Sequence, residues 1–132
     1  MRLRAIWVLL LTATAASCGE VYQQHLVGPY DLAAIDTEEQ TSVYYRLSDG
    51  NGIGRIEPTV FSVGWNDRYI VAEQHPGNNK AVINYFYLDM TKDNQLADPA
   101  ASVTGPLIAD EFSRKAAELH LPRFRLTLQS LE

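Results

Sequence analysis

Short runs of alternating apolar and polar residues, each bounded by turn-forming residues, recur along most of this 132-residue chain. The clearest pair is Thr59–Trp65 and Arg68–Gln74, joined by Asn66 and Asp67. Because successive side chains of a strand point to opposite faces of a sheet, such runs predict half-buried strands. A two-residue Asn-Asp connection predicts a type I′ hairpin, since both residues tolerate a positive φ. We therefore expect a chain built mainly of antiparallel sheet.

Four further runs predict strands of the same kind. They cover Tyr30–Asp36, Ser42–Leu47, Val82–Met90 and Arg123–Leu131. The run Val82–Met90 is apolar on both faces, which is typical of a central strand that a helix covers. The glycine-containing stretch 48–58 and the polar stretch 91–102 are expected to be turns and loops.

One segment has helical periodicity. Pro106 favours the first turn of this helix, and Pro122 is expected to stop it after about His120. Its apolar stripe comprises Ile108, Phe112, Ala116 and Leu119, with the stem of Lys115. The element order predicts an α+β fold, an antiparallel sheet of about five to six strands packed on one helix. A small open β-barrel is the alternative.

The only cysteine of the chain, Cys18, follows a segment that is typical of an export signal. Arg2 and Arg4 precede an apolar run from 5 to 16, and small residues stand at 15–17. The apolar run is short for a spanning helix, which needs about 20 apolar residues. The segment resembles the lipobox of bacterial lipoproteins, which implies that residues 1–17 are removed and that Cys18 carries lipid. An ordinary secretory signal is the alternative.

The lipobox resemblance implies an exported protein that is anchored to a membrane by lipid, such as palmitate, at its N-terminus. Two acyl chains make such an anchor effectively permanent. With Gly19 after the cysteine, the resemblance implies the outer membrane facing the periplasm if the cell is Gram-negative. Residues 18–28 are then expected to be a tether and residues 29–132 a single globular domain.

The charge of the chain argues against one class of partner. Removal of Arg2 and Arg4 would leave nine of the 11 Lys and Arg residues against 16 Asp and Glu, so the formal charge would fall from −5 to −7. A domain this acidic repels the phosphate backbone, and we expect no nucleic-acid partner.

The residue pattern contains no familiar catalytic or metal-binding motif. No thiol remains beyond Cys18, and no Gly-x-Ser-x-Gly elbow is present. His25, His75 and His120 lack the spacing of metal ligands on one element. The glycine-rich segment 49–54 lacks the oxygen ligands of a calcium loop. We therefore expect no catalytic residue, no metal and no cofactor.

Aromatic residues are the candidate binding surface. They are Tyr44, Trp65, Tyr69, Tyr85 and Tyr87, which stand beside polar residues on the predicted strands. Such residues suit the recognition of proteins, peptides or glycans. The alternative is that the helix covers Tyr85 and Tyr87 and that Trp65 fills the core.

The mature chain resembles a family of small bacterial lipoproteins known only as a domain of unknown function. The stretches that carry this resemblance are Gly28–Leu32, Val63–Ala72, Tyr85–Asp89, Gly105–Leu107 and Glu111-Phe112. Because no activity is known for the family, the resemblance implies no catalytic residue.

The sequence leaves three functional hypotheses. The first is a lipid-anchored, non-enzymatic envelope protein that binds another macromolecule, an envelope protein or a glycan. The second is an immunity or inhibitor lipoprotein that blocks a basic toxin or hydrolase with its acidic surface. The third is a small hydrolase, which predicts that two or more acidic residues converge in one cleft. The candidate acids are Asp31, Asp36, Asp49, Asp67 and Asp89.

Overall fold

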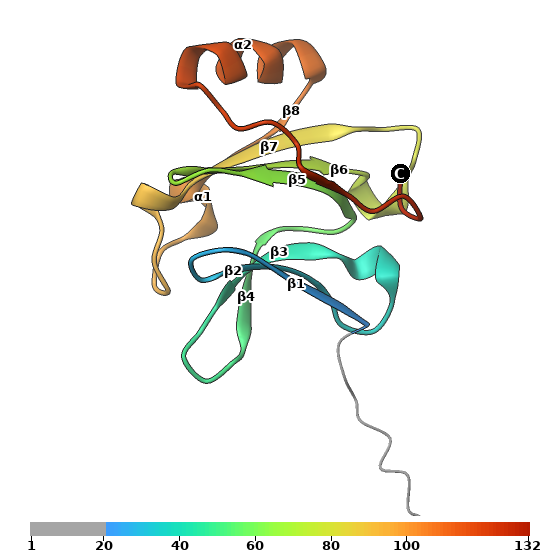
Figure 1. Cartoon of the computed structure of the whole chain (residues 1–132). Helices are drawn as coiled ribbons and strands as arrows, with labels where there is room; N and C mark the ends of the chain where they lie inside the picture. The colour runs from blue at the N-terminus through green and yellow to red at the C-terminus, as the bar shows by residue number, and fades with distance from the viewer. Residues whose placement is uncertain (1–20) are drawn as a thin grey trace, which may run out of the picture.

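The computed structural model describes residues 21–132, which form two antiparallel sheets and one main helix (Figure 1). The predicted signal segment and Cys18 lie outside these residues. Within residues 21–132, no helix is long and apolar enough to cross a membrane.

The two sheets differ in size and in strand order. The first sheet has the order β1-β2-β3-β4, with β1 Tyr22–Val27, β2 Tyr30–Ala34, β3 Ser42–Arg46 and β4 Gly52–Ile56. The second has the order β8-β7-β6-β5-β9, with β5 Val60–Trp65, β6 Tyr69–Gln74, β7 Asn84–Asp89, β8 Val103–Leu107 and β9 Leu126–Thr127. The helices are η1 Glu38–Gln40, η2 Pro76–Asn78, η3 Met90–Lys92, α1 Pro99–Ser102 and α2 Ala109–Leu119.

The hydrophobic core lies between the two sheets, and α2 lies on the outer face of the second sheet (Figure 1). Leu32 and Val43 of the first sheet and Val63, Ile70 and Leu88 of the second are completely buried. A smaller aromatic cluster lies beneath α2, because Phe112 of the helix stacks on Tyr85 of β7 and also contacts Phe124. Each face of the second sheet is therefore covered over part of its area.

The predicted combination of antiparallel sheet and one main helix is confirmed, and β7 is the central, helix-covered strand that its sequence predicts. The prediction of one sheet was wrong, because the strands divide into two sheets that do not close into a barrel. Strands β4 and β8 were not predicted. The first contains Gly52 and Gly54 and the second contains Pro106, and these residues are unfavourable within strands.

The β5–β6 hairpin is confirmed, but its turn is not of type I′. Neither Asn66 nor Asp67 has a positive φ. Instead, the side-chain oxygen of Asn66 accepts hydrogen bonds from the backbone N–H groups of Arg68 and Tyr69, at 2.9 and 2.7 Å. An Asn side chain that satisfies the backbone in this way defines an Asx turn, which needs no left-handed residue.

The predicted tether contains a strand. Tyr22–Val27 forms β1 and pairs along its length with β2, so the ordered domain begins well before residue 29. Its polar sequence, Tyr-Gln-Gln-His-Leu-Val, has little alternation, because three successive residues of this edge strand, Gln23–His25, are exposed and so both of its faces are partly exposed.

Helix α2 ends at Leu119 as predicted but begins at Ala109, so Pro106 belongs to β8 and Ile108 is exposed. The predicted strand Arg123–Leu131 is reduced to Leu126–Thr127. Before β9, the chain crosses over β5 at Gly64, where a Cβ atom would lie 2.0 Å from the carbonyl oxygen of Arg123. Glycine is therefore required at this crossing.

Candidate functional site: a cationic pocket beneath α2

A polar pocket, here called the α2 pocket, lies between the outer face of the second sheet and the C-terminal half of α2. Its volume is about 180 Å³. It is lined by Arg68, Tyr69, Tyr87, Asp89, Lys92, Ser102, Thr104, Lys115 and Leu119, with Ala101. These residues come from the β5–β6 turn, β6, β7, η3, α1, β8 and α2. The site therefore exists only after most of the second sheet has formed.

Strand periodicity explains how the floor of the pocket is built. Tyr69 is the direct partner of Asp89 in the ladder between β6 and β7, and Tyr87 is the partner of Thr104 in the ladder between β7 and β8. Partners in a ladder point to the same face, and residues two apart in β7 do so as well. Tyr69, Tyr87, Asp89 and Thr104 consequently share the face that α2 partly covers.

Asp89 is buried at one side of the α2 pocket and is held by three donors. The guanidinium of Arg68 donates to its two oxygens at 3.1 and 3.4 Å, and Thr91 donates both its hydroxyl and its backbone N–H. Burial by itself would raise the pKa of the Asp89 carboxyl, but these hydrogen bonds outweigh it and hold that pKa below its usual range. Asp89 is therefore ionised at neutral pH, and its charge is balanced by Arg68.

Two further cations stand around the pocket. Lys115 of α2 lies 3.3 Å from the exposed carboxylate of Glu118, a pair on the helix surface. Lys92 of η3 forms no ion pair within residues 21–132. Because Arg68 and Asp89 neutralise each other, Lys92 and Lys115 are the remaining cations of the pocket lining, on a chain whose net charge is −5.

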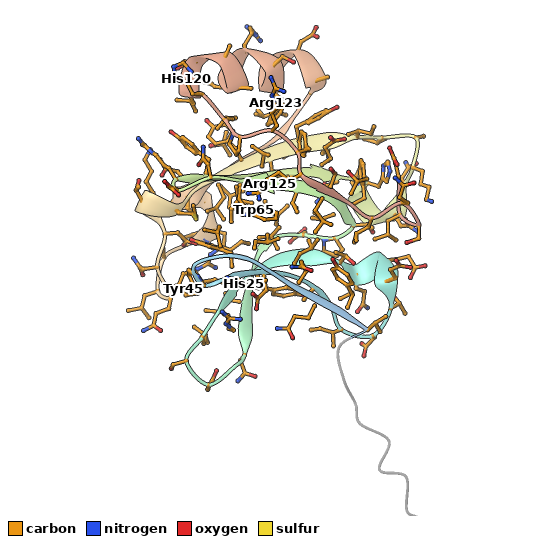
Figure 2. The ribbon with its side chains drawn as sticks, in the orientation of Figure 1. His25, Tyr45, Trp65, His120, Arg123 and Arg125 are labelled. Atoms are coloured by element: carbon orange, nitrogen blue, oxygen red, sulfur yellow. The ribbon has the colours of Figure 1, made fainter. Side chains whose placement is uncertain are left out.

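The pocket brings two of the five predicted aromatic residues together. The rings of Tyr69 and Tyr87 pack edge to face at 6.2 Å. Tyr85 instead stacks on Phe112 at 5.0 Å, in the apolar cluster beneath α2. Tyr44 lies in the first sheet, beside Gly52. Trp65 packs against the core and carries Arg125 over its ring at 4.2 Å, as Figure 2 shows.

The acidic residues that a hydrolase would need do not converge in the part of the chain that the structure describes. Asp31, Asp67 and Asp89 line three different cavities, and Asp36 and Asp49 line none of them. Across residues 21–132, no three His, Cys, Asp or Glu side chains gather into a metal-binding group.

The three histidines occupy unrelated places. His25 lies in β1 and contacts Asp31, whereas His120 caps the end of α2 in a left-handed conformation. His75 is buried and stacks on Phe61 at 4.2 Å. Its Nδ1–H donates to the carbonyl of Val82 at 2.8 Å, and its buried Nε2 has no partner among residues 21–132.

A second polar cluster lies on the outer face of the first sheet, beside a smaller cavity. The carboxylate of Asp31 is buried and accepts hydrogen bonds from Arg46 at 3.1 Å and from Gln23 at 3.3 Å, beside His25 at 3.2 Å. The adjacent cavity has a volume of only about 50 Å³. We therefore interpret this cluster as a set of groups that neutralise the buried carboxylate of Asp31, and not as a ligand site.

A larger groove, about 510 Å³, opens between β4 and β8. Its lining includes Pro58, Pro76, Pro99 and Pro106, and its one cation, Arg55, already pairs with Asp93. Its polar side chains Gln74 and Asn84 are also bonded within the protein, because Gln74 donates to the carbonyl of Glu57 at 2.9 Å and Asn84 donates to Gln74 at 3.1 Å.

Sequence reasoning missed Lys92, Ser102, Thr104 and Lys115, because they lie in four separate elements and only the tertiary fold brings them together. One weak signal was present. Because Tyr87 and Asp89 are two residues apart in a strand, alternation places a carboxylate and an aromatic hydroxyl on one face, and a cation is a common partner of such a carboxylate.

Comparison with known families gives one match. Residues 27–132 match the model of DUF3997, a family described as a protein of unknown function, so the chain belongs to this family. No curated protein and no solved structure matches the chain.

Proposed function

We propose that this member of DUF3997 is a lipid-anchored envelope protein that binds another envelope molecule, a protein or a glycan, through the α2 pocket and without catalysing a reaction. The observation that carries the proposal is the pocket itself. It joins cations, hydroxyl groups and two aromatic residues from seven separate segments on an otherwise acidic chain. Convergent polar groups in a concave site are the usual mark of ligand binding.

The chemistry of the pocket favours binding over catalysis. Ser102 donates to the carbonyl of Pro99 at 3.4 Å, and no histidine or cysteine lines the pocket among residues 21–132. A serine nucleophile needs an adjacent base to activate it. Asp89 is held ionised by Arg68 and Thr91, so it is a poor proton donor at neutral pH.

The proposed anchor and the pocket suit each other in position. Cys18 precedes Val21 by three residues, and an extended chain covers at most about 3.6 Å per residue, or roughly 10 Å in all. A lipid on Cys18 would therefore hold the beginning of β1 close to the membrane. Helix α2 lies on the opposite side of the molecule from the first sheet, which contains β1 (Figure 1). The α2 pocket would then face away from the membrane, towards other envelope components.

The anchor is tested by metabolic labelling with an alkyne-bearing palmitate. We expect the wild-type chain to be labelled and to sediment with membranes, and Cys18→Ala to lose the label and become soluble. Labelling that persists in Cys18→Ala would contradict the proposed anchor.

The binding role is tested by photo-crosslinking in intact cells. A photo-crosslinking amino acid at Leu119, on the pocket rim, is expected to give a discrete adduct with an envelope protein or glycan. The matched control is the same amino acid at the exposed Gln24, on β1. Adducts that are absent at both positions, or identical at both, would overturn the proposal. A basic toxin or hydrolase as the captured molecule would identify the protein as an inhibitor.

A further inference from the structure

The charges of the α2 pocket do not cancel. Asp89 takes its hydrogen bonds from Arg68 and Thr91, so that carboxylate is already neutralised. Lys92 lacks an ion-pair partner within the described chain, and the partner of Lys115 is a solvent-exposed Glu118 at 3.3 Å. Exposed pairs on a helix surface are weak and are readily exchanged for a better partner. Two ammonium groups are therefore available to a ligand of negative charge.

Hydroxyl groups complete a set of donors. Tyr87 and Thr104 face each other across the β7–β8 ladder, and neither hydroxyl has a hydrogen-bond partner among residues 21–132. Ammonium and hydroxyl groups together are the donors that phosphate and carboxylate oxygens accept from, and bonds to a charged acceptor are the stronger ones. A cationic ligand would be repelled by the ammonium groups of Lys92 and Lys115.

The size of the pocket limits what enters it. Its volume of about 180 Å³ lies below the roughly 300–1,000 Å³ that is typical of pockets for whole drug-sized ligands. One oxyanion group fits this description, with the remainder of the ligand outside the rim.

We propose that the α2 pocket binds a single oxyanion group, a phosphate or a carboxylate, with Lys92 and Lys115 as its charge partners and the hydroxyls of Tyr87 and Thr104 as further donors. That this group belongs to a larger envelope molecule rests on the proposed function, whereas binding of the oxyanion itself does not. A phosphorylated envelope polymer or a carboxylate of a glycan or peptide would each supply the required chemistry.

The test is an NMR titration of the full chain in a non-ionic detergent, with inorganic phosphate or acetate replacing chloride at constant ionic strength. We expect saturable shifts of the backbone amides of Thr104 and Lys115 with at least one of the two anions. Saturation by phosphate alone assigns a phosphate source, and saturation by acetate alone assigns a carboxylate source. Failure of both anions to saturate these shifts would overturn the inference.

Three variants make the assignment specific. Lys92→Gln is expected to lower the affinity for the anion that saturates the shifts about tenfold, because the anion loses one charged partner. Lys80→Gln, an exposed lysine outside the pocket, is the matched control and is expected to leave affinity unchanged. Glu118→Gln is expected to strengthen binding, because it releases Lys115. Equal weakening by Lys92→Gln and Lys80→Gln, or weakening by Glu118→Gln, would contradict the site.

The inference and the proposed function fail separately. An adduct from Leu119 together with no anion binding would overturn the oxyanion assignment and leave the binding role intact. Anion binding with no adduct at Leu119 in cells would overturn the binding role and leave the oxyanion assignment intact.

Discussion

Two Arg–Asp pairs in this protein have the same chemistry and opposite surroundings. Arg55 and Asp93 are completely buried, at 2.8 Å, and join β4 to the loop after η3. Arg68 and Asp89, at 3.1 Å, lie at the α2 pocket, where the arginine side chain is 55% exposed. The first pair is shielded from solvent, whereas the guanidinium of the second pair is exposed beside a pocket that a ligand can enter.

The partners of each pair explain this difference. The carboxylate of Asp93 also accepts a hydrogen bond from Tyr30 at 2.8 Å, and Arg55 also donates to the carbonyls of Gly54 and Asn94. Each guanidinium nitrogen of Arg55 and each carboxylate oxygen of Asp93 therefore has a partner within the protein. The pair at the pocket has fewer partners and stands beside Lys92, which forms no ion pair in the described part of the chain. Satisfied polar groups specify a fold, and unsatisfied cations attract a ligand.

The largest effect is expected at the buried pair. Arg55→Met leaves the Asp93 carboxylate buried without its cation, and we expect a loss of about 3–5 kcal/mol in the free energy of unfolding. Denaturant titration measures this loss. Arg68→Met, the matched variant at the pocket, is expected to lose much less because its guanidinium is exposed. Equal losses in the two variants would contradict the difference that we assign to the two pairs, because the buried and the exposed arginine would then contribute equally to stability.

A smaller loss is expected from Tyr30→Phe, which removes one hydroxyl from the buried pair and leaves the ring in place. The buried oxygen of Asp93 then loses one donor, which costs about 1–3 kcal/mol. The same denaturant titration measures it. Because Tyr30 also packs edge to face against Tyr45, a loss as large as that of Arg55→Met would mean that ring packing has changed.

The pocket pair predicts a pH dependence of defined sign. The folded-state pKa of Asp89 lies below its ordinary value of 3.8, so its pairing stabilises the protein above that value. That stabilisation is lost as the pH falls through the folded-state pKa. The stability difference between wild type and Asp89→Asn should therefore be constant near neutral pH and shrink below about pH 4. A difference that grows with acid would contradict the assigned direction.

The smallest effect on stability is expected from Lys92→Gln. Its ammonium is exposed and makes no ion pair within residues 21–132, so unfolding should be unchanged within error. Thermal unfolding without added anion measures this directly. A clear loss of stability would mean that Lys92 has a structural role and would weaken its assignment to ligand binding.

Local patterns predicted the regions where neighbouring residues decide the structure. The β5–β6 hairpin, the central strand β7 and the end of α2 follow from alternation, apolar content and Pro122. The division into two sheets did not follow, because the pairing of distant strands leaves no mark in any one run. The C-terminal strand is short because the chain first crosses β5 at Gly64, a contact between residues that are about 60 positions apart.

The candidate site shows the same division. Tyr69 and Tyr87 were predicted as part of a candidate binding surface because each belongs to a recognisable strand; Tyr69 is buried, and Tyr87 is half-buried. Lys92, Thr104 and Lys115 were not predicted, since their proximity depends on how η3, β8 and α2 meet above β7. The buried pair of Arg55 and Asp93 escaped prediction for the same reason, because it links β4 to the loop after η3, 38 positions later in the chain.

Crosslinking from Leu119 in intact cells that carry Lys92→Gln or the control Lys80→Gln shows whether the cations of the α2 pocket hold an envelope ligand. We expect the adduct to disappear with Lys92→Gln and to persist with Lys80→Gln, at equal protein levels. An adduct of unchanged intensity in both variants would contradict this expectation.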